Sequence, residues 1–282
     1  MEPNAFVSLY KPKGVSSFKV LSSLKKALNT KKVGHMGTLD PLAEGILPVA
    51  VGKYTKLIPY VNLLPKKYEV EIFFGMNSET LDSEGVDLDA LPKIDSQLDL
   101  ETLQKVVEGF VGMIDQIPPK YSAIKINGQR AYKLARENNI EVEQIKSRPV
   151  ELFSVSNFRL QDQTLSFTLE CGSGFYVRSL VRDIGIKLDL PCFMLSLKRT
   201  HVGAFNLENA SRELDYKYLD LDSVIKDVNI LKVNFEQAEL ICNGMPLELS
   251  LADGFYWVFD SNNELAFCSS SNNILTVIRR LC

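Results

Sequence analysis

The sequence predicts a mixed α/β fold of the α+β type, in which helices flank a central mixed β-sheet and a small β-rich domain follows. Strand and amphipathic-helix patterns alternate through residues 5–205 of the 282-residue chain. One strand, residues 46–51, is apolar throughout, which is typical of a strand buried on both faces. From about residue 205 the chain becomes acidic and contains short strand patterns. We therefore expect a larger domain over residues 1–231 and a small domain over 232–282.

The first elements lead to a glycine-rich loop. Residues 5–10 predict a strand, and Ser16 or Ser17 is placed to cap a helix. The apolar stripe of that helix consists of Phe18, Leu21, Leu24 and Leu28. The loop of residues 32–45 then holds Asp40 just before the buried strand. A loop positioned by a rigid scaffold is a common place for a functional group, although an Asp-Pro pair also shapes ordinary turns.

The rest of the chain adds strands, helices and one projecting unit. Periodicity predicts, in order, a half-buried strand at 66–74, an acidic loop at 77–97, a helix at 99–112, strands at 148–158 and 164–171, a helix beginning near Arg178, a strand within 194–205, a helical linker, and strands at 255–260, 264–269 and 274–281. An Asn127-Gly128 turn followed by basic residues 130–136 predicts a hairpin and helix, within an insertion at about 120–148. That unit is suited to gripping an RNA backbone, and it is equally suited to being an ordinary surface hairpin.

Charge is strongly segregated along the chain, although the net charge is only −3. Residues 1–67 contain eleven lysines against three acidic residues, whereas residues 77–115 contain ten acids against two lysines. Residues 116–150 are basic again, with seven basic groups against three acids. Segregation of this kind allows basic faces to follow phosphate in an acidic protein, while solvated surface lysines remain the alternative.

Several classes of protein do not fit the sequence. Five scattered cysteines without a C-x-x-C spacing predict reduced thiols rather than a disulfide framework or a zinc site. No window is apolar enough to span a bilayer and no secretory leader is evident, so we expect a soluble cytoplasmic protein. Only His35 and His201 are available as imidazoles. A metal-dependent hydrolase built on Asp40 and His35 would lack further ligands.

Residues 34–48, GHMGTLDPLAEGILP, resemble the active-site motif of the TruB family, the bacterial tRNA pseudouridine-55 synthases. Further matches follow in family order: Lys11 to Gly14, Lys67-Tyr68, Pro118 to Lys125 with Gly128 and Tyr132 to Arg136, Gly174 to Arg178, and Leu197 to Thr200 with Gly203 and Phe205. The resemblance covers about residues 5–205. The small domain is similar, more weakly, to a PUA-type RNA-binding domain.

The resemblance implies a pseudouridine synthase fold and isomerisation of the T-loop uridine of tRNA. The N1 glycosidic bond breaks, the uracil turns, and C5 joins the ribose, with no cofactor and no metal. Asp40 matches the catalytic aspartate, either as a nucleophile or as the base for the 2′ proton. Arg178 matches its partner, and a guanidinium suits orienting a carboxylate and keeping it charged in a dry pocket.

The same resemblance assigns four substrate-binding residues besides Arg178. Tyr68 matches the residue that stacks on the target base, and Tyr176 and Leu197 match groups of the same pocket. His35 matches the histidine that helps reshape the T-loop when the base is flipped out. Core packing, or for His35 a role in stabilising the loop, is the alternative for each. The implied partner is the T-arm stem-loop of tRNA. We expect the protein to bind it as a monomer and not to associate with a membrane.

The sequence departs from the family pattern at two places. It reads Ser78-Glu79-Thr80-Leu81-Asp82 where the family has Thr-Asp-Thr before an aspartate, and Gly174-Phe175-Tyr176 where the family has Gly-Thr-Tyr. These changes affect the acidic loop and the surroundings of Arg178, and neither removes a group assigned to chemistry. Two other functions stay open, a non-catalytic tRNA-folding factor and a metal-dependent RNA hydrolase.

Overall fold

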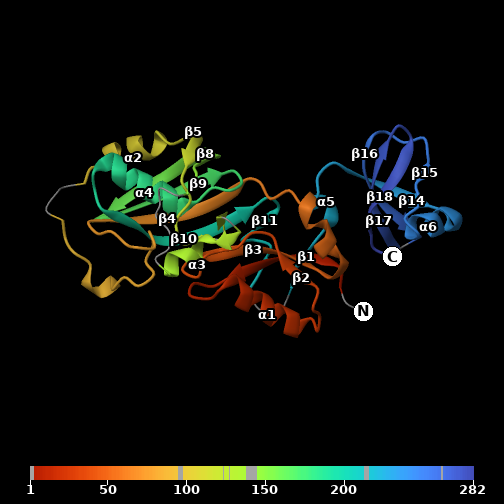
Figure 1. The fold of residues 1–282 in the computed structure, drawn as a ribbon, viewed down its shortest axis with the longest axis horizontal. Helices are drawn as coiled ribbons and strands as arrows, with labels where there is room; N and C mark the ends of the chain where they lie inside the picture. The colour runs from red at the N-terminus through yellow and green to blue at the C-terminus, as the bar shows by residue number, and fades with distance from the viewer. Residues whose placement is uncertain are drawn as a thin grey trace.

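A computed structural model describes residues 3–94, 98–122, 124–126, 128–137, 145–212, 216–261 and 263–282. An 11-stranded mixed sheet forms the larger part of the molecule, and a separate five-stranded sheet lies at its other end (Figure 1). The predicted α+β class, with a mixed sheet flanked by helices, is confirmed. No helix within the described ranges is long and apolar enough to cross a membrane.

The larger sheet has the strand order β12-β1-β3-β10-β4-β9-β8-β5, and β11, β13 and β2 pair with β10, β1 and β3. Its strands are β1 (Ala5–Lys11), β2 (Val33–His35), β3 (Glu44–Val51), β4 (Lys66–Phe74), β5 (Gly112–Gln116), β8 (Arg148–Gln161), β9 (Thr164–Cys171), β10 (Cys192–Val202), β11 (Phe205–Asn206), β12 (Ala210–Ser211) and β13 (Tyr218–Leu219). β10 runs parallel to β3 and antiparallel to β4. The C-terminal half of β10 thus lies between the strand after the Asp40 loop and the strand that carries Tyr68.

Helices cover the two halves of this sheet separately. Helix α1 (Ser17–Ala27) is capped by the Ser16 hydroxyl and packs Leu21 and Leu24 on β1 and β3. Helices α2 (Leu100–Glu108) and α4 (Val177–Leu188) pack on the half formed by β4, β8, β9 and β10. β3 sends alternate side chains into two different cores, so the predicted burial of this strand on both faces is confirmed.

The second sheet has the order β14-β16-β17-β18-β15. Its elements are β14 (Val228–Val233), α6 (Phe235–Cys242), β15 (Leu247–Glu248), β16 (Gly254–Asp260), β17 (Asn263–Ser271) and β18 (Ile274–Arg280). One face packs on α6. The other face shares a core with residues next to the larger sheet, where Trp257 and Phe267 meet Tyr54 and Leu57 of the 3-10 helix η1 (Gly52–Tyr60). The three predicted terminal strands are confirmed.

Several expectations differ from the structure. Phe18 is 76% exposed and lies off the buried stripe of α1. The predicted helix 99–112 ends at Glu108, and Gly112, at φ +109°, already begins the edge strand β5. In the described part of the segment predicted as a helical linker, the one helix is the single turn α5 (Leu221–Val224), and the acidic loop holds the 3-10 turn η2 (Leu88–Ala90).

The cysteines are not all free thiols, contrary to expectation. Cys242 at the end of α6 forms a disulfide with Cys282, with the two Cα atoms 5.9 Å apart. Because this pairing depends on the last residue folding back on α6, spacing alone gave no sign of it. Cys171, Cys192 and Cys268 are free and buried.

The predicted hairpin and helix are confirmed in their described part. β6 (Lys125–Ile126) and β7 (Gln129–Arg130) form a two-stranded hairpin that leads into α3 (Ala131–Arg136). Asn127 of the predicted turn, and residues 138–144 of the insertion, lie outside the described residues. Whether this unit grips RNA stays a prediction.

Candidate active site

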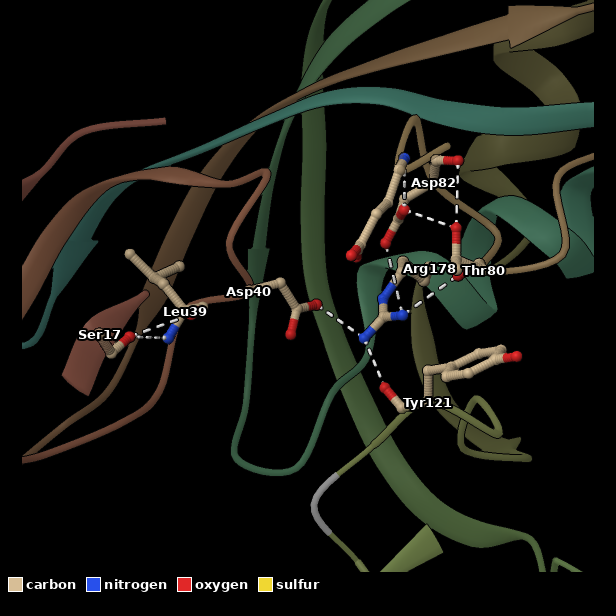
Figure 2. Close-up of polar contacts among 8 residues, drawn as sticks. Ser17, Leu39, Asp40, Thr80, Asp82, Tyr121 and Arg178 are labelled. Carbon is tan, nitrogen blue, oxygen red and sulfur yellow. Dashed lines mark hydrogen bonds and ion pairs between the residues drawn. The ribbon is translucent and has the colours of Figure 1, made fainter. Parts of the chain in front are cut away.

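Asp40 lies in the loop between β2 and β3, and the main chain on both sides of it is anchored. The Ser17 hydroxyl accepts a hydrogen bond from the Leu39 N–H and donates one to the Leu39 carbonyl, both at 3.0 Å (Figure 2). On the other side, the Pro41 carbonyl accepts from the Lys11 ammonium at 3.2 Å and from the Gly14 N–H at 2.8 Å. The carboxylate is therefore presented from a fixed backbone.

Arg178 meets that carboxylate from the first turn of α4. Its Nη2 lies 2.7 Å from Asp40 Oδ2. The guanidinium is 6% exposed, whereas the Asp40 side chain is 39% exposed. Two main-chain carbonyls, of Thr80 at 3.1 Å and Tyr121 at 2.9 Å, also accept hydrogen bonds from Arg178. The arginine is thus fixed before any ligand arrives, and the carboxylate remains reachable from outside.

Asp82 lies at the other terminal nitrogen of Arg178 from Asp40 (Figure 2). Its Oδ2 lies 3.4 Å from Nη1 of the arginine, and its side chain is 2% exposed. Asp82 Oδ1 accepts hydrogen bonds from the Thr80 hydroxyl at 2.7 Å and from the Glu84 N–H at 2.9 Å. The acidic loop therefore keeps its carboxylate against Arg178 despite its changed motif. Sequence reasoning noted Asp82 without giving it a role.

Tyr68 and Leu197 form an apolar wall next to the Asp40 loop. They are 7% exposed each and share a cluster with Leu39 and Leu42, the residues on either side of Asp40-Pro41. Burial raises the pKa of the Tyr68 hydroxyl, which therefore stays protonated, and the Arg199 guanidinium opposes that shift. These two predicted pocket residues come together with Asp40 and Arg178.

His35 and Tyr176 lie at the margin of this arrangement. His35 ends β2, and burial, followed by the nearby Arg199 charge, lowers the pKa of its imidazole, which is therefore neutral at pH 7. Its buried Nδ1 has no partner among the described residues. Tyr176 caps the start of α4, where its main chain bonds the Gln116 side chain and its ring lies 5.7 Å from the Arg148 guanidinium.

A cleft of about 810 Å³ opens along the sheet beside this group. Leu42 and Leu197 line it, together with the cations of Lys13, Arg159 and Lys198. Glutamates of β3 and β4 line it as well. Asp40, Tyr68 and Arg178 are not among its lining residues, so the cleft adjoins the Asp40 loop through Leu42 and Leu197.

Two buried cations near the loop were not assigned a role from the sequence. The Lys11 ammonium, on a fully buried side chain, donates to three main-chain carbonyls, and burial lowers its pKa to about 8. Arg199 of β10 donates to two further carbonyls of the same region. Because main-chain acceptors occur at every position, nothing in the sequence pattern marks these contacts.

The chain is similar to proteins of known family over most of its length. Residues 25–177 match the family model described as TruB family pseudouridylate synthase (N terminal domain). The protein of Rickettsia bellii (strain OSU 85-389) named tRNA pseudouridine synthase B is 35% identical over 288 residues, 97% of this chain and 97% of that protein. Its namesake in Ehrlichia ruminantium (strain Gardel) is 38% identical over 296 residues, 97% of this chain and 98% of that protein.

Two solved structures share the fold at low sequence identity. "Crystal structure of the archaeal box H/ACA sRNP Nop10-Cbf5 complex" has a TM-score of 0.67 and 16% identity, and the match covers 99% of this chain and 86% of that one. "Crystal Structure of a Cbf5-Nop10-Gar1 Complex" has a TM-score of 0.63 and 20% identity, covering 94% and 78%. Both matches extend over the two sheets described above.

Proposed function

The chain belongs to the TruB family of pseudouridylate synthases and isomerises uridine to pseudouridine, and we propose that its target is the T-loop uridine of tRNA and its reacting group the carboxylate of Asp40. One observation carries the proposal. A reachable carboxylate, 39% exposed, lies 2.7 Å from a guanidinium that is almost fully buried. The site therefore offers one charged oxygen pair, oriented in advance, to a ligand that reaches the Asp40 loop.

The reaction needs an anion beside the ribose of the target nucleotide. The bond between uracil N1 and ribose C1′ breaks, the ring turns, and C5 bonds to C1′ while N1 gains a proton and C5 loses one. Asp40 suits either attack on the substrate or removal of the 2′ proton, because both require its ionised form. Arg178 keeps that form oriented through a charge-assisted hydrogen bond.

The apolar wall suits the detached uracil. Tyr68 offers a ring for stacking and Leu197 an apolar side chain, so a flipped base would displace water from Asp40. We assign His35, as a neutral imidazole, to the space that the extruded base leaves in the T-loop. Tyr176, two residues before Arg178, is assigned to the pocket of Tyr68 and Leu197.

Recognition of the T arm is proposed to follow the shape of the folded RNA through phosphate and 2′-OH contacts. The projecting unit of residues 120–148 and the PUA-like domain of residues 232–282 extend that surface. A monomer suffices, because Asp40, Tyr68 and Arg178 come from one chain. Sedimentation of the enzyme with T-arm RNA should accordingly give a one-to-one complex.

The decisive experiment uses a T-arm RNA with tritium at C5 of the target uridine. We expect the wild-type chain to release the tritium stoichiometrically. Asp40→Asn should release none while its dissociation constant for the RNA, measured by fluorescence anisotropy, changes little. Full tritium release by that variant would remove Asp40 from the chemistry.

The same assay separates the two other functions considered. A non-catalytic folding factor would bind the RNA and leave the tritium at C5. A metal-dependent hydrolase would lose activity with a chelator and shorten the RNA on a denaturing gel. We expect tritium release that is insensitive to the chelator, with RNA of unchanged length.

A further inference from the structure

Arg199 lies in β10 beneath the Asp40 loop, and the chemistry described above does not use it. Its side chain is large and only 2% exposed. Within the part of the chain that the structure describes, no carboxylate forms an ion pair with it. A buried charge without a counter-ion is costly. The hydrogen bonds that satisfy this guanidinium therefore indicate the role of Arg199.

Those hydrogen bonds go to both ends of the loop that carries Asp40. Nε donates to the Ile46 carbonyl at 2.8 Å, and Nη2 donates to the Gly37 carbonyl at 2.9 Å. Gly37 precedes Asp40 by three residues, and Ile46 follows it in β3. One rigid, planar side chain thus fixes the distance between the start and the end of the loop.

The backbone of Arg199 is itself fixed against the strands on both sides. It pairs with Gly45 of β3 and with Tyr68 of β4. A Cβ atom at Gly45 would lie 2.2 Å from the Arg199 carbonyl oxygen, so the two strands are in direct contact there. Arg199 therefore pairs with the strand that carries Tyr68 and also binds the Asp40 loop.

The charge of Arg199 reaches the same groups. It opposes the burial-driven rise in the pKa of Tyr68. It also adds to the lowering of the pKa of His35, after burial. The guanidinium therefore lies close enough to influence the ionisation of two residues that the proposed function assigns to substrate binding.

We propose that Arg199 is a positioning residue, which holds the Asp40 loop by the Gly37 and Ile46 carbonyls and sets it in register with Tyr68. The inference rests on the proposed roles of Asp40 and Tyr68. A lysine keeps the charge of Arg199 but lacks the planar guanidinium, whose Nε and Nη2 hold the two carbonyls at a fixed spacing and direction. Shape as well as charge is therefore required at this position.

The test compares Arg199→Lys and Arg199→Gln with a control in the same strand. Phe193→Leu changes a fully buried ring of β10 that packs on Phe73, at 5.5 Å between centroids, away from the loop. We expect the arginine variants to lower the single-turnover rate about 10- to 100-fold, as a displaced catalytic group does. Their dissociation constants for T-arm RNA should change less than about threefold. Phe193→Leu should lower Tm yet keep its rate within about twofold.

A second measurement reports the position of the Arg199 charge and does not depend on the stability of the fold. The chain has two histidines, so their imidazole NMR signals are readily assigned. Arg199→Gln should raise the pKa of His35, and Phe193→Leu should leave it unchanged. If Arg199→Lys does not fold at the assay temperature, the single-turnover rate of Arg199→Gln is compared with that of Phe193→Leu instead.

The outcomes separate this inference from the proposed function. A wild-type rate in a folded Arg199→Lys or Arg199→Gln would overturn the positioning role while leaving Asp40 chemistry intact. A rate loss in Phe193→Leu as large as that in the arginine variants would also overturn it, because general destabilisation would then explain both. Absence of tritium release from the wild-type chain would instead remove the proposed function.

Discussion

Arg178 is held by groups from three separate segments, and this decides how Asp40 is presented. Asp40 and Asp82 bind its two terminal nitrogens, at 2.7 and 3.4 Å. The Asp82 carboxylate is buried and receives two hydrogen bonds of its own. A second carboxylate at the other terminal nitrogen limits how far the guanidinium can move away from Asp40, because both ion pairs need the same planar group.

Asp82→Asn should therefore lower the isomerisation rate, by about tenfold or more, without loss of RNA binding. The amide keeps the size of the side chain but leaves Arg178 without a counter-charge on that side. Single-turnover tritium release and anisotropy titration measure the two quantities. Asp87→Asn, in the same acidic loop but capping only η2, is the control, and an equal loss of rate there would count against the role of Asp82.

The buried thiol of Cys192 makes stability depend on alkaline pH. Burial raises its pKa from 9.0 to about 12 in the folded chain. Its stabilising effect is therefore complete below about pH 9 and is lost as pH rises towards 12. Between about pH 8 and pH 10 the advantage of wild type over Cys192→Ala, in free energy of unfolding from urea titrations, should shrink by about 1.4 kcal/mol. If the difference in free energy of unfolding stayed constant over this pH range, the Cys192 thiol would ionise equally in the folded and the unfolded chain.

At the scale of elements, the site depends on how closely β3 approaches β10. The parallel pairing of these two strands covers only residues 44–45 and 198–199. Gly45, at φ +106°, has no room for a side chain against the Arg199 carbonyl. The absence of a Cβ atom at this position thus brings the Asp40 loop and the strand of Leu197 together.

Gly45→Ala should lower the free energy of unfolding by more than about 2 kcal/mol, because backbone strain and a close contact act together. Gly85→Ala is the matched control, since Gly85 also has a positive φ, +77°, but faces open space. We expect it to cost only about 1 kcal/mol. Urea unfolding followed by circular dichroism compares the two, and equal losses would show that the contact with β10 contributes nothing.

Across the whole molecule, periodicity predicted the elements whose side chains alternate over a long run. β4, β8, β9 and α4 appear within a few residues of the predicted bounds. The short edge strand β5 was missed, because five residues with mixed burial give little periodic signal and its pairing with β8 is non-local. The helix α6 inside the small domain was also missed, where only strand patterns stood out.

The sequence predicted which residues belong to the site but not which of them are in contact. The motif residues identified Asp40 and Arg178, yet their contact depends on docking α4 beside a loop that is more than 130 residues earlier in the chain. The buried cations Lys11 and Arg199 bind main-chain carbonyls, which no residue type announces. The sequence therefore identifies the reacting groups more readily than it identifies the groups that hold them in place.

The structure also divides the basic N-terminal segment into two kinds of lysine. Lys53 and Lys56 of η1 donate to the carbonyls of Leu281 and Arg280, so they fasten the C-terminal end of the chain. Lys67 is paired with Glu170. Other lysines of α1 and the loop after it, such as Lys26 and Lys31, are exposed. We therefore expect phosphate contacts from the second group.

That division predicts how RNA binding responds to salt. The logarithm of the dissociation constant for T-arm RNA should rise with the logarithm of salt concentration, with a slope of several units, because bound counter-ions are released. Replacing Lys26 and Lys31 together with alanine should reduce that slope by about 1 to 2 units, one for each lost phosphate contact. Lys105→Ala removes an exposed lysine that pairs with Glu101 on α2 and should leave the slope unchanged. A slope that is the same in all three proteins would show that the α1 lysines are solvated and take no part in holding the RNA.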